Sequence, residues 1–512
     1  MSEPLRNTEI NETSGAETLE KKKNKDAAYY IKSVIGLAIM AFFGYLPAPE
    51  PITEVGMTVL GQFIGLIFLW TLVDLVWPTF AAIVMFGTVA FQVYPGSFAL
   101  AGVYEAGMQS IGCWVVVIMI GLLIVCEVFN ETGLMRRIAM WFLNTKTAKR
   151  SSWGFTFMFL LAAFIIGILM DVTVAQVFML ALAKEIFDAI GMNKDDKWTK
   201  IITIGITFSV VIGFGATPFC HTLPILFMGI YAGIAGAAIN WVSYMLITVP
   251  VGIVIWFAML GFMRYIVKPD MSKLTNMDHA KMEEMRPGPM SKREKTVAVL
   301  AVLLIISWIL PGFLSILLPN AGFTTWMNGI TMLTPLLVVI VIMAIVRVEG
   351  RPLLDISAVM NKVSFTVVFF LAGIMLIATA MGEDTTGISN WVREVLAPMT
   401  EGMSPFVFIA FLALASVILT NIANNVPVGI IMITVGVPLA LQMGMNPFLV
   451  AVTVSFASNL AFTIPPAFVP VGICYADPFG GPKTTLKWGL VMCLICVVLC
   501  ALLIYPLGLL FA

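Results

Sequence analysis

A few polar side chains interrupt the long apolar stretches of this sequence, and their types could bind an ion or a small solute. Asp171 lies near the middle of the apolar region 152–190. If that region lies in a membrane, an ionisable side chain there is energetically expensive and marks a functional site by default. Asp171 could cap a helix, since aspartate is a favoured N-cap. It could also ligate sodium through its oxygens or carry a proton, and we treat it as the candidate coupling residue.

His221 is a second candidate, because it closely follows Thr217 and Pro218 in the apolar region 198–232. A histidine changes charge near neutral pH and, when charged, can donate to a carboxylate. It could also be a neutral side chain that is bonded to a nearby carbonyl oxygen. A pair with Asp171 is a further alternative that the sequence leaves open.

Amide side chains cluster later in the chain. Asn421, Asn424 and Asn425 include pairs three and four residues apart, the spacing that puts two side chains on one helix face. An amide offers both a donor and an acceptor, which suits a carboxylate or a sodium ion. Together with Ser458 and Asn459 they could form a polar pocket. The alternative is ordinary hydrogen bonding between helices.

The composition places these residues in a membrane protein. Hydrophobic residues make up 60% of the 512 residues and charged residues only 11%, and the mean hydropathy is +0.99. A soluble domain has roughly 25% charged residues, so a soluble enzyme is excluded. The net charge is +0 and gives no reason to expect a nucleic-acid partner. Only 2 histidines are present, so we expect no transition-metal site and no cofactor other than a sodium ion.

Apolar runs separated by charged residues, prolines and glycines predict an all-α polytopic membrane protein. Two long runs with polar centres, 152–190 and 403–443, are predicted to be re-entrant hairpins. Two others, 198–232 and 447–478, have Gly, Pro and Thr at their centres and are predicted to be helices broken at mid-membrane. The chain would then cross the membrane about eleven times. The simple spans are expected at 28–46, 54–74, 77–94, 112–130, 240–264, 296–317, 326–346, 362–381 and 486–511.

The distribution of basic residues predicts the orientation of the chain. With this set of crossings, all but one of the 29 lysine and arginine residues fall on the side of the N-terminus. Cytoplasmic loops carry an excess of basic residues. The N-terminus is therefore expected to be cytoplasmic and the C-terminus extracytoplasmic, in the plasma membrane. Residues 1–27 would be a disordered cytosolic tail, and 266–295 a cytosolic loop.

The order of predicted elements in residues 54–265 recurs in residues 296–512. Each half has two spans, a third with a glycine-containing centre, a hairpin, a broken helix and a final span. An odd number of crossings per half requires opposite orientations, and such inverted repeats with paired broken helices indicate a secondary transporter with a midplane site. Non-helical backbone is tolerated in a membrane only where it lines a protein cavity. The breaks, expected at 213–218 and 463–466, would therefore mark the site.

At these residues the chain resembles the divalent anion:sodium symporter family, within the wider ion transporter superfamily. The similarity covers almost the whole chain after residue 27, with two inverted repeats that each contain a re-entrant hairpin and a broken helix. The family's hairpin tips read Ser-Asn-Thr. The tips of this chain align as Asp171-Val172-Thr173 and as Thr420-Asn421-Ile422, the latter followed by Ala423-Asn424-Asn425.

The resemblance implies a dimeric transporter with an elevator-like motion of the hairpins, the broken helices and the last span of each half. In the family, tip side chains and backbone oxygens of the broken helices bind sodium, and the tip Asn and Thr hold substrate carboxylates. By position, the coupling-ion residues would be Asp171, Thr173, Gly213, Gly215, Thr420, Asn421 and Asn459. The substrate-binding residues would be Thr173, Thr217, Pro218, His221, Thr420, Asn421, Asn424, Asn425, Thr463 and Pro465.

We therefore predict a secondary active transporter of small organic anions, similar to di- and tricarboxylates, coupled to sodium or protons. The sequence contains no GxxxxGK[ST] motif and no nucleophile–base constellation, so neither a nucleotide-driven pump nor an enzyme is expected. A cation/proton antiporter of the same superfamily, using Asp171, is the first alternative, and a channel or uniporter is the second. The expected partners are the anion, the coupling cation, the lipid bilayer and a second copy of the chain.

Overall fold

The computed structural model describes residues 27–511, apart from residues 75, 96–98, 220, 276–286, 319, 331, 362, 364, 389, 392–393, 396–397, 399–401 and 466. The predicted N-terminal tail, except its last residue, and the middle of the predicted loop 266–295 lie outside the described residues. The described chain is almost entirely helical. Its one sheet, among these residues, is an antiparallel pair of two-residue strands, β1 (Arg347–Val348) and β2 (Arg351–Pro352).

Nine helices among the described residues are long and apolar enough to cross a membrane. Shorter apolar helices of 10–17 residues accompany them. These helices confirm the predicted class, an all-α polytopic membrane protein. The number of crossings, the orientation and the inverted repeats remain predictions.

The chain that precedes the first predicted hairpin departs from the prediction at two places. The predicted span 77–94 is divided, because α3 ends at Phe86 and the Thr88 hydroxyl then donates to the Met85 carbonyl oxygen at 2.6 Å. A side-chain bond of this kind competes with the continuing helix. The helix α5 has no counterpart among the predicted spans. The elements are α1 (Ala27–Phe42), η1 (Phe43–Tyr45), α2 (Glu54–Leu72), α3 (Trp77–Phe86), α4 (Ala90–Val93), α5 (Ala99–Gln109), α6 (Trp114–Glu131), α7 (Leu134–Leu143) and α8 (Lys146–Arg150).

Each region predicted to be a hairpin contains two helices joined by a two-residue link. Ser151 and Ser404 cap the first helix of each pair, since their hydroxyl oxygens accept from the backbone N–H groups of Gly154 and Val407. Whether either pair re-enters the membrane stays a prediction. The helices are α9 (Ser152–Leu169), α10 (Val172–Ile190), α22 (Pro405–Ile422) and α23 (Asn425–Gln442).

Each region predicted to be a broken helix also contains two helices. The first interruption spans residues 217–221 and the second spans residues 458–468. The first begins later than expected and the second begins earlier, and both differences have a structural cause that is described below. The helices are α11 (Lys197–Ala216), α12 (Thr222–Ala235), α24 (Phe448–Ala457) and α25 (Val469–Ala476).

The remaining elements follow the predicted spans, with one shorter helix. The predicted span 326–346 is reduced to α18, because the separate helix α17 precedes it. The elements are α13 (Trp241–Phe262), the π-helical turn η2 (Met263–Val267), α14 (Ser272–Thr275), α16 (Lys292–Leu317), α17 (Gly322–Gly329), α18 (Leu333–Ile345), α19 (Ile356–Met360), α20 (Phe365–Gly382), η3 (Asp384–Thr386) and α26 (Pro482–Phe511).

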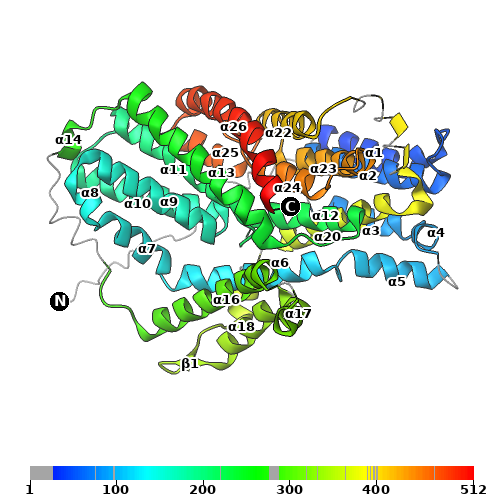
Figure 1. Cartoon of the computed structure of the whole chain (residues 1–512), viewed down its shortest axis with the longest axis horizontal. Coiled ribbons are helices and arrows are strands. Elements are labelled where there is room, and N and C mark those ends of the chain that lie inside the picture. The colour runs from blue at the N-terminus through cyan, green and yellow to red at the C-terminus, as the bar shows by residue number, and fades with distance from the viewer. Residues whose placement is uncertain are drawn as a thin grey trace, which may run out of the picture.

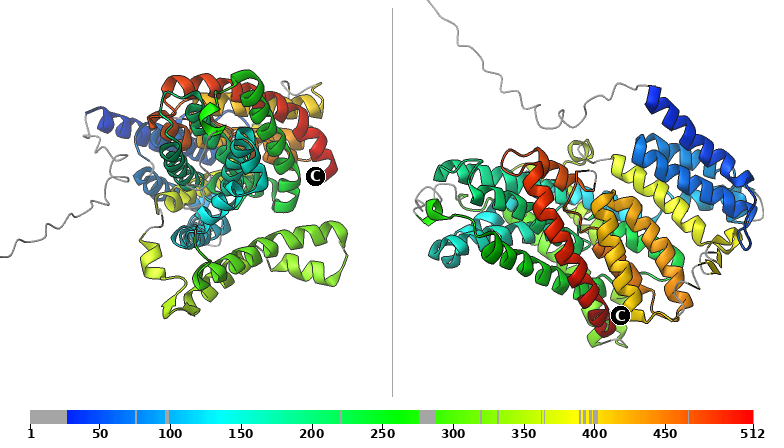
Figure 2. Two further views of the ribbon diagram at one scale, coloured as in Figure 1. Left: turned by 90° about the vertical axis from the view of Figure 1, so that its left-hand side faces the viewer. Right: turned by 90° about the horizontal axis from the view of Figure 1, so that it is seen from above.

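The hairpin helices pack on the broken helices. The helix α9 packs along α11, and α22 and α23 pack along α24. The helix α12 contacts α6 and α20 as well as α23 and α24, so it lies between the hairpin helices and the other spans. In Figure 1 the first hairpin lies at the left and α1 to α5 lie at the right. Figure 2 shows α16 to α18 as a layer of their own on one side of the molecule.

Candidate functional site

Asp171 is the N-cap residue of α10. Its Oδ1 accepts hydrogen bonds from the backbone N–H groups of Thr173 at 2.9 Å and Val174 at 3.3 Å. One carboxylate oxygen thus satisfies two amides that have no partner within the helix. The capping role considered from the sequence is therefore present. A neutral asparagine could supply the same cap, so the net charge of the carboxylate is available for a cation or a proton.

Asn424 has the same place in the second hairpin. It is the N-cap residue of α23, and its Oδ1 accepts from the Val426 N–H at 3.0 Å. Matching the two caps pairs Asp171-Val172-Thr173 with Asn424-Asn425-Val426. The expected second tip at Thr420-Asn421-Ile422 is therefore wrong by about one turn, because those residues are the last three of α22.

The helix α11 continues through the glycines that are predicted to break it. Gly213 and Gly215 lie in the last turn of α11, which ends at Ala216, and the first non-helical residue is Thr217. A Cβ atom on Gly213 would lie 2.5 Å from the Phe164 carbonyl oxygen in α9, so this glycine permits close helix packing instead. The Thr217 hydroxyl donates to the Ile168 carbonyl oxygen at 3.1 Å and fastens the break to the first hairpin.

Two side chains of α13 stabilise the end of α11. Tyr244 Oη donates to the Gly215 carbonyl oxygen at 2.6 Å, and Thr248 Oγ1 donates to the Ala216 carbonyl oxygen at 2.7 Å. Carbonyls at a helix end lack intrahelical partners, and leaving them buried without a partner is costly. The sequence analysis missed both residues. A signal was available, because they are four residues apart in a predicted span and so share a helix face.

Asn421 ties the second hairpin to the second break. Its Nδ2 donates to the carbonyl oxygens of Val417 and Leu460, each at 2.8 Å, and its Oδ1 accepts from the Phe462 N–H at 2.8 Å. Its own carbonyl oxygen accepts from the Thr463 hydroxyl. Asn421 is only 4% exposed. Its amide therefore holds non-helical backbone in place, which explains why the break can begin well before the predicted prolines.

Thr420 and Asn425 add bonds on either side of Asn421. Thr420 Oγ1 donates to the Ser458 carbonyl oxygen at 2.7 Å, at the start of the break. The Asn425 backbone N–H donates to the Ala467 carbonyl oxygen at 3.2 Å, near its end. The end of α22 and the start of α23 thus contact the two ends of the non-helical segment.

Four buried polar atoms near this junction have no hydrogen-bond partner among the described residues. They are Ser416 Oγ, Ser458 Oγ, Asn425 Nδ2 and Asn459 Oδ1. Burial of such a group without a hydrogen bond costs about 1–3 kcal/mol, so these atoms are candidates to bind an ion or a polar solute. Asn459 also lies at the meeting point of the two breaks, because a Cβ atom on Gly215 would be 3.3 Å from its Cβ.

The N-terminal ends of α10, α12 and α23 are linked to that of α25 by hydrogen bonds and ring contacts. Gln176 of α10 donates to the Pro470 carbonyl oxygen in the first turn of α25 at 2.8 Å, and the Asn425–Ala467 bond brings the start of α23 to the same helix. The start of α12 is linked through aromatic rings. His221 is the N-cap residue of α12, and its ring centroid lies 4.5 Å from that of Phe214. The Phe214 ring in turn lies 5.7 Å, between centroids, from the ring of Phe468, which is the N-cap residue of α25. Helix N-termini favour negative charge, so this arrangement suits an anion.

The other predicted site residues differ in exposure. Pro218 and His221 are buried, whereas Asn424 and Pro465 are exposed. The hydrogen bonds of Asp171 described above go to the backbone of α10, and its pairing with His221 stays a prediction. Burial of the histidine side chain is compatible with either of the two roles considered for it.

The match to a known family extends over nearly the whole chain. Residues 27–510 match the family model described as the sodium:sulfate symporter transmembrane region. The chain belongs to this family. This membership confirms the resemblance inferred from the sequence. It also confirms that the chain is a transporter and not an enzyme, because the members of the family are symporters.

Relatives of this symporter include proteins from bacteria and mammals. The sodium-dependent dicarboxylate transporter SdcS of Staphylococcus saprophyticus is 26% identical over 378 residues, which is 69% of this chain and 70% of that protein. Solute carrier family 13 member 2 of Rattus norvegicus is 28% identical over 221 residues, 39% of this chain and 36% of that protein. The Na(+)/citrate cotransporter of the same species is 28% identical over 242 residues, 41% of this chain and 40% of that protein. The symporter thus matches less than half of each rat protein.

Two solved structures have a similar fold. The crystal structure of the Alcanivorax borkumensis YdaH transporter has a TM-score of 0.51 at 14% identity, covering 94% of the symporter and 97% of that chain. The structure of Neisseria gonorrhoeae MtrF has a TM-score of 0.55 at 17% identity, covering 93% of each chain. At these identities the likeness concerns the fold alone.

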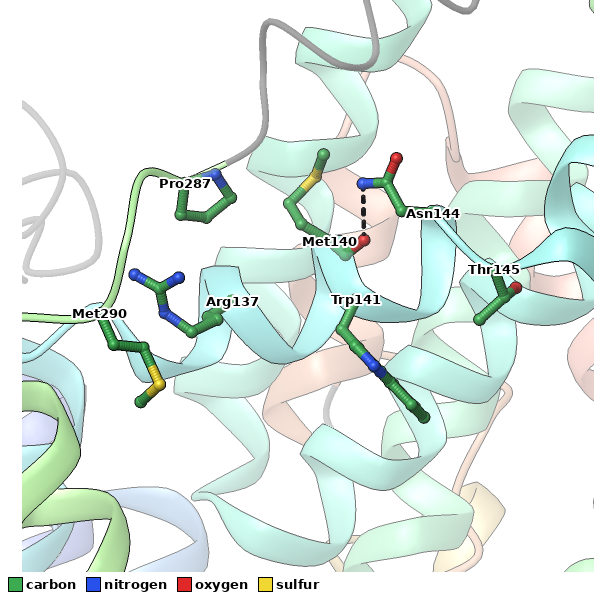
Figure 3. A pocket seen from close by; sticks show the side chains of 7 residues that line it. All are labelled: Arg137, Met140, Trp141, Asn144, Thr145, Pro287 and Met290. Atoms are coloured by element: carbon green, nitrogen blue, oxygen red, sulfur yellow. Dashed lines mark hydrogen bonds between the residues drawn. The ribbon is translucent and has the colours of Figure 1, made fainter.

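A surface cavity of about 420 Å³ lies away from the predicted site of the symporter, between α7 and the segment before α16. Figure 3 shows Arg137 and Trp141 on α7 and Asn144 just after its end, with Pro287 and Met290 on the opposite segment. The Arg137 guanidinium donates to the Gly288 carbonyl oxygen at 2.8 Å and pairs with Glu294 at 3.1 Å. The charge of this arginine is therefore already neutralised, so the cavity offers little attraction for an anion.

Gly213→Ala is expected to destabilise the symporter by about 1–3 kcal/mol, the usual cost of overpacking, because the new methyl group would lie 2.5 Å from the Phe164 carbonyl oxygen. Gly261→Ala in α13 is the matched control, since nothing lies within 4 Å of its Cβ position and alanine favours a helix by about 1 kcal/mol. The unfolding temperature of the purified protein in detergent measures both changes. An unchanged value for Gly213→Ala would show that α9 and α11 are not closely packed there.

Proposed function

We propose that this symporter carries small organic anions with two or three carboxylates, driven by sodium ions or protons. The observation that carries the proposal is the convergence of the N-terminal ends of α10, α12, α23 and α25. Asp171 already caps α10, and each of the other three helix N-termini is equivalent to about half a positive charge, so together they offset roughly 1.5 negative charges on a substrate. The names of the relatives, a sodium-dependent dicarboxylate transporter and a Na(+)/citrate cotransporter, support the same substrate class.

The substrate would lie between the two hairpin tips and the two breaks. Amide and hydroxyl groups there can donate to carboxylate oxygens, and the unpartnered Nδ2 of Asn425 is the strongest candidate donor. His221 at the start of α12 could add a charged donor. The proposed substrate residues are Thr173, Thr217, Pro218, His221, Thr420, Asn421, Asn424, Asn425, Thr463 and Pro465.

The coupling cation would occupy the same region, next to Asp171 and the ends of the broken helices. Hard cations prefer oxygen ligands, and the unpartnered Oδ1 of Asn459 is such an atom. An ionised Asp171 would repel a dianion, so a cation or a proton on Asp171 would favour substrate binding and thereby couple the two. The proposed ion residues are Asp171, Thr173, Gly213, Gly215, Thr420, Asn421 and Asn459.

Transport would follow an elevator-like motion within a homodimer in the plasma membrane, with the two halves as inverted repeats. The bonds of Thr217 to α9, and of Thr420 and Asn421 to the second break, would keep hairpins and broken helices together as they move. The helix α12, which contacts α6 and α20, would slide against these two spans.

A cation/proton antiporter is the second candidate, because a carboxylate at the first tip could exchange a sodium ion for a proton without any anion. The hydrogen bonds of Asp171 to two backbone amides use only one of its oxygens, and this favours the candidate. In that case Asp171 would alternate between its two cations. The four converging helix N-termini would then have no evident ligand.

Uptake into proteoliposomes tests these functions. Succinate, citrate and sulfate would each be supplied with an inward sodium gradient, an inward proton gradient, or neither. Carboxylate uptake that depends on one cation gradient is the expected result. Sodium-driven proton movement without an anion would support the antiporter, and equal uptake without any gradient would indicate a uniporter or channel.

A further inference from the structure

A positively charged surface groove lies where α16 begins and α18 ends, outside the proposed transport site. We call it the basic groove. It has a volume of about 590 Å³. The residues that line it are Lys292, Lys295, Thr296, Arg347, Val348 and Glu349.

The cationic side chains of the basic groove are available to a ligand. Lys292, Lys295 and Arg347 are all exposed, and among the described residues no carboxylate forms an ion pair with any of them. Glu349 is the one acidic side chain in the lining, so the groove keeps a net positive charge. This is the reverse of the α7 cavity, where Glu294 already neutralises Arg137.

Exposed apolar side chains continue from the groove along both helices. On α16 they recur every three or four residues on the face that carries Lys292 and Lys295, and on α18 they end just before Arg347. Both stripes therefore lead to a cationic end. On α16 they are Val299, Val302, Leu303 and Ile306, and on α18 Leu337, Val338, Val341 and Ile345.

We propose that the basic groove binds the headgroup of an acidic phospholipid, whose acyl chains lie along the exposed stripes of α16 and α18. A phosphate group accepts hydrogen bonds and charge from lysine and arginine. Basic pockets at the cytoplasmic ends of spans attract anionic lipids, which are enriched in that leaflet. The groove lies on the side that the distribution of basic residues assigns to the cytoplasm.

A second copy of the chain fits this surface less well than a lipid does. Two copies that met through the cationic ends of α16 and α18 would bring lysine and arginine side chains close to each other, which is unfavourable. Figure 2 shows the layer of α16 to α18 at one edge of the molecule, where its outer face can meet lipid. The proposal does not depend on which anion the symporter carries.

The test compares phospholipids in a thermal unfolding assay of the full-length protein in detergent. Phosphatidylglycerol is expected to raise the unfolding temperature more than phosphatidylcholine does at the same concentration. The triple variant Lys292→Gln, Lys295→Gln, Arg347→Gln should need at least about tenfold more phosphatidylglycerol for the same effect. The matched control replaces three exposed lysines elsewhere, Lys146→Gln, Lys194→Gln and Lys483→Gln, and should respond as the natural chain does.

Four results would overturn the proposal. One is a full response of the triple variant to phosphatidylglycerol, and another is an equal loss of response in the control variant. A third is an equal rise in unfolding temperature with inorganic phosphate alone, which would mean that the groove takes a soluble anion. Crosslinking of a cysteine placed at Val302 to its copy in a second chain, unaffected by lipid, would likewise identify a protein partner.

Discussion

Asp171→Asn is expected to weaken cation-driven anion uptake at least tenfold while the protein stays folded. Asparagine is as good an N-cap as aspartate, so the bonds to the Thr173 and Val174 amides can be kept. What is lost is one negative charge. Two opposite charges about 4 Å apart attract by roughly 4 kcal/mol at the effective dielectric of a protein, and a tenfold change needs only about 1.4 kcal/mol.

The measurement is uptake by proteoliposomes over a range of sodium concentrations and pH values, with the unfolding temperature as a check on folding. Asp171→Ala is the companion variant, because it removes both the charge and the cap, and it should lose about 1 kcal/mol of stability in addition. A loss of pH dependence with sodium dependence intact would identify Asp171 as a proton carrier. Unchanged dependence on both cations would mean that Asp171 is only a helix cap.

Asn421→Ala is expected to abolish uptake and to lower the free energy of unfolding by about 2–6 kcal/mol. The substitution would leave the Leu460 carbonyl oxygen and the Phe462 N–H buried without their partner. Each unsatisfied group costs about 1–3 kcal/mol. The break would then lose the hydrogen bonds that hold its backbone against α22, and the site between the breaks would lose its shape.

Asn424→Ala is the control for Asn421→Ala, since it lies three residues away and removes the same side-chain atoms. Asn424 is exposed and makes one local capping bond, to the Val426 N–H, so its loss should cost only about 1 kcal/mol. The unfolding temperatures of the two variants in detergent give the comparison, and succinate uptake is measured for Asn421→Ala alone because Asn424 is itself a proposed substrate residue. Equal stability of the two would contradict the tie between the second hairpin and the second break.

Much of the architecture could be predicted, because a membrane restricts the chain strongly. Apolar runs of sufficient length predict spanning helices, and the regions 152–190 and 403–443 are too long and too polar at their centres for single spans. The structure divides each of these regions into two helices. Asp171 could be singled out for the same reason, since a carboxylate in an apolar run is costly.

The exact ends of the helices could not be predicted, because they depend on partners that are remote in sequence. The glycines at 213 and 215 remain helical because α9 approaches one of them closely and because the hydroxyls of Tyr244 and Thr248 donate to the carbonyl oxygens at the end of α11. The second break begins early because Asn421 replaces the missing backbone hydrogen bonds. Backbone groups in an apolar interior must find partners, and only the folded chain determines which partners are available.

The sequence by itself determined the class of the protein, the family it resembles and the regions in which the site must lie, since all three follow from hydropathy, charge and local order. Only the tertiary structure decided which polar groups are used for support and which remain for a ligand. Asn421, a proposed site residue, uses its amide for hydrogen bonds to α22 and to the second break, whereas Asn425 and Asn459 keep unpartnered buried atoms. The approach of the N-termini of α10, α12 and α23 to α25 is likewise a tertiary feature, because α10 and α25 lie about 300 residues apart and only packing brings them together.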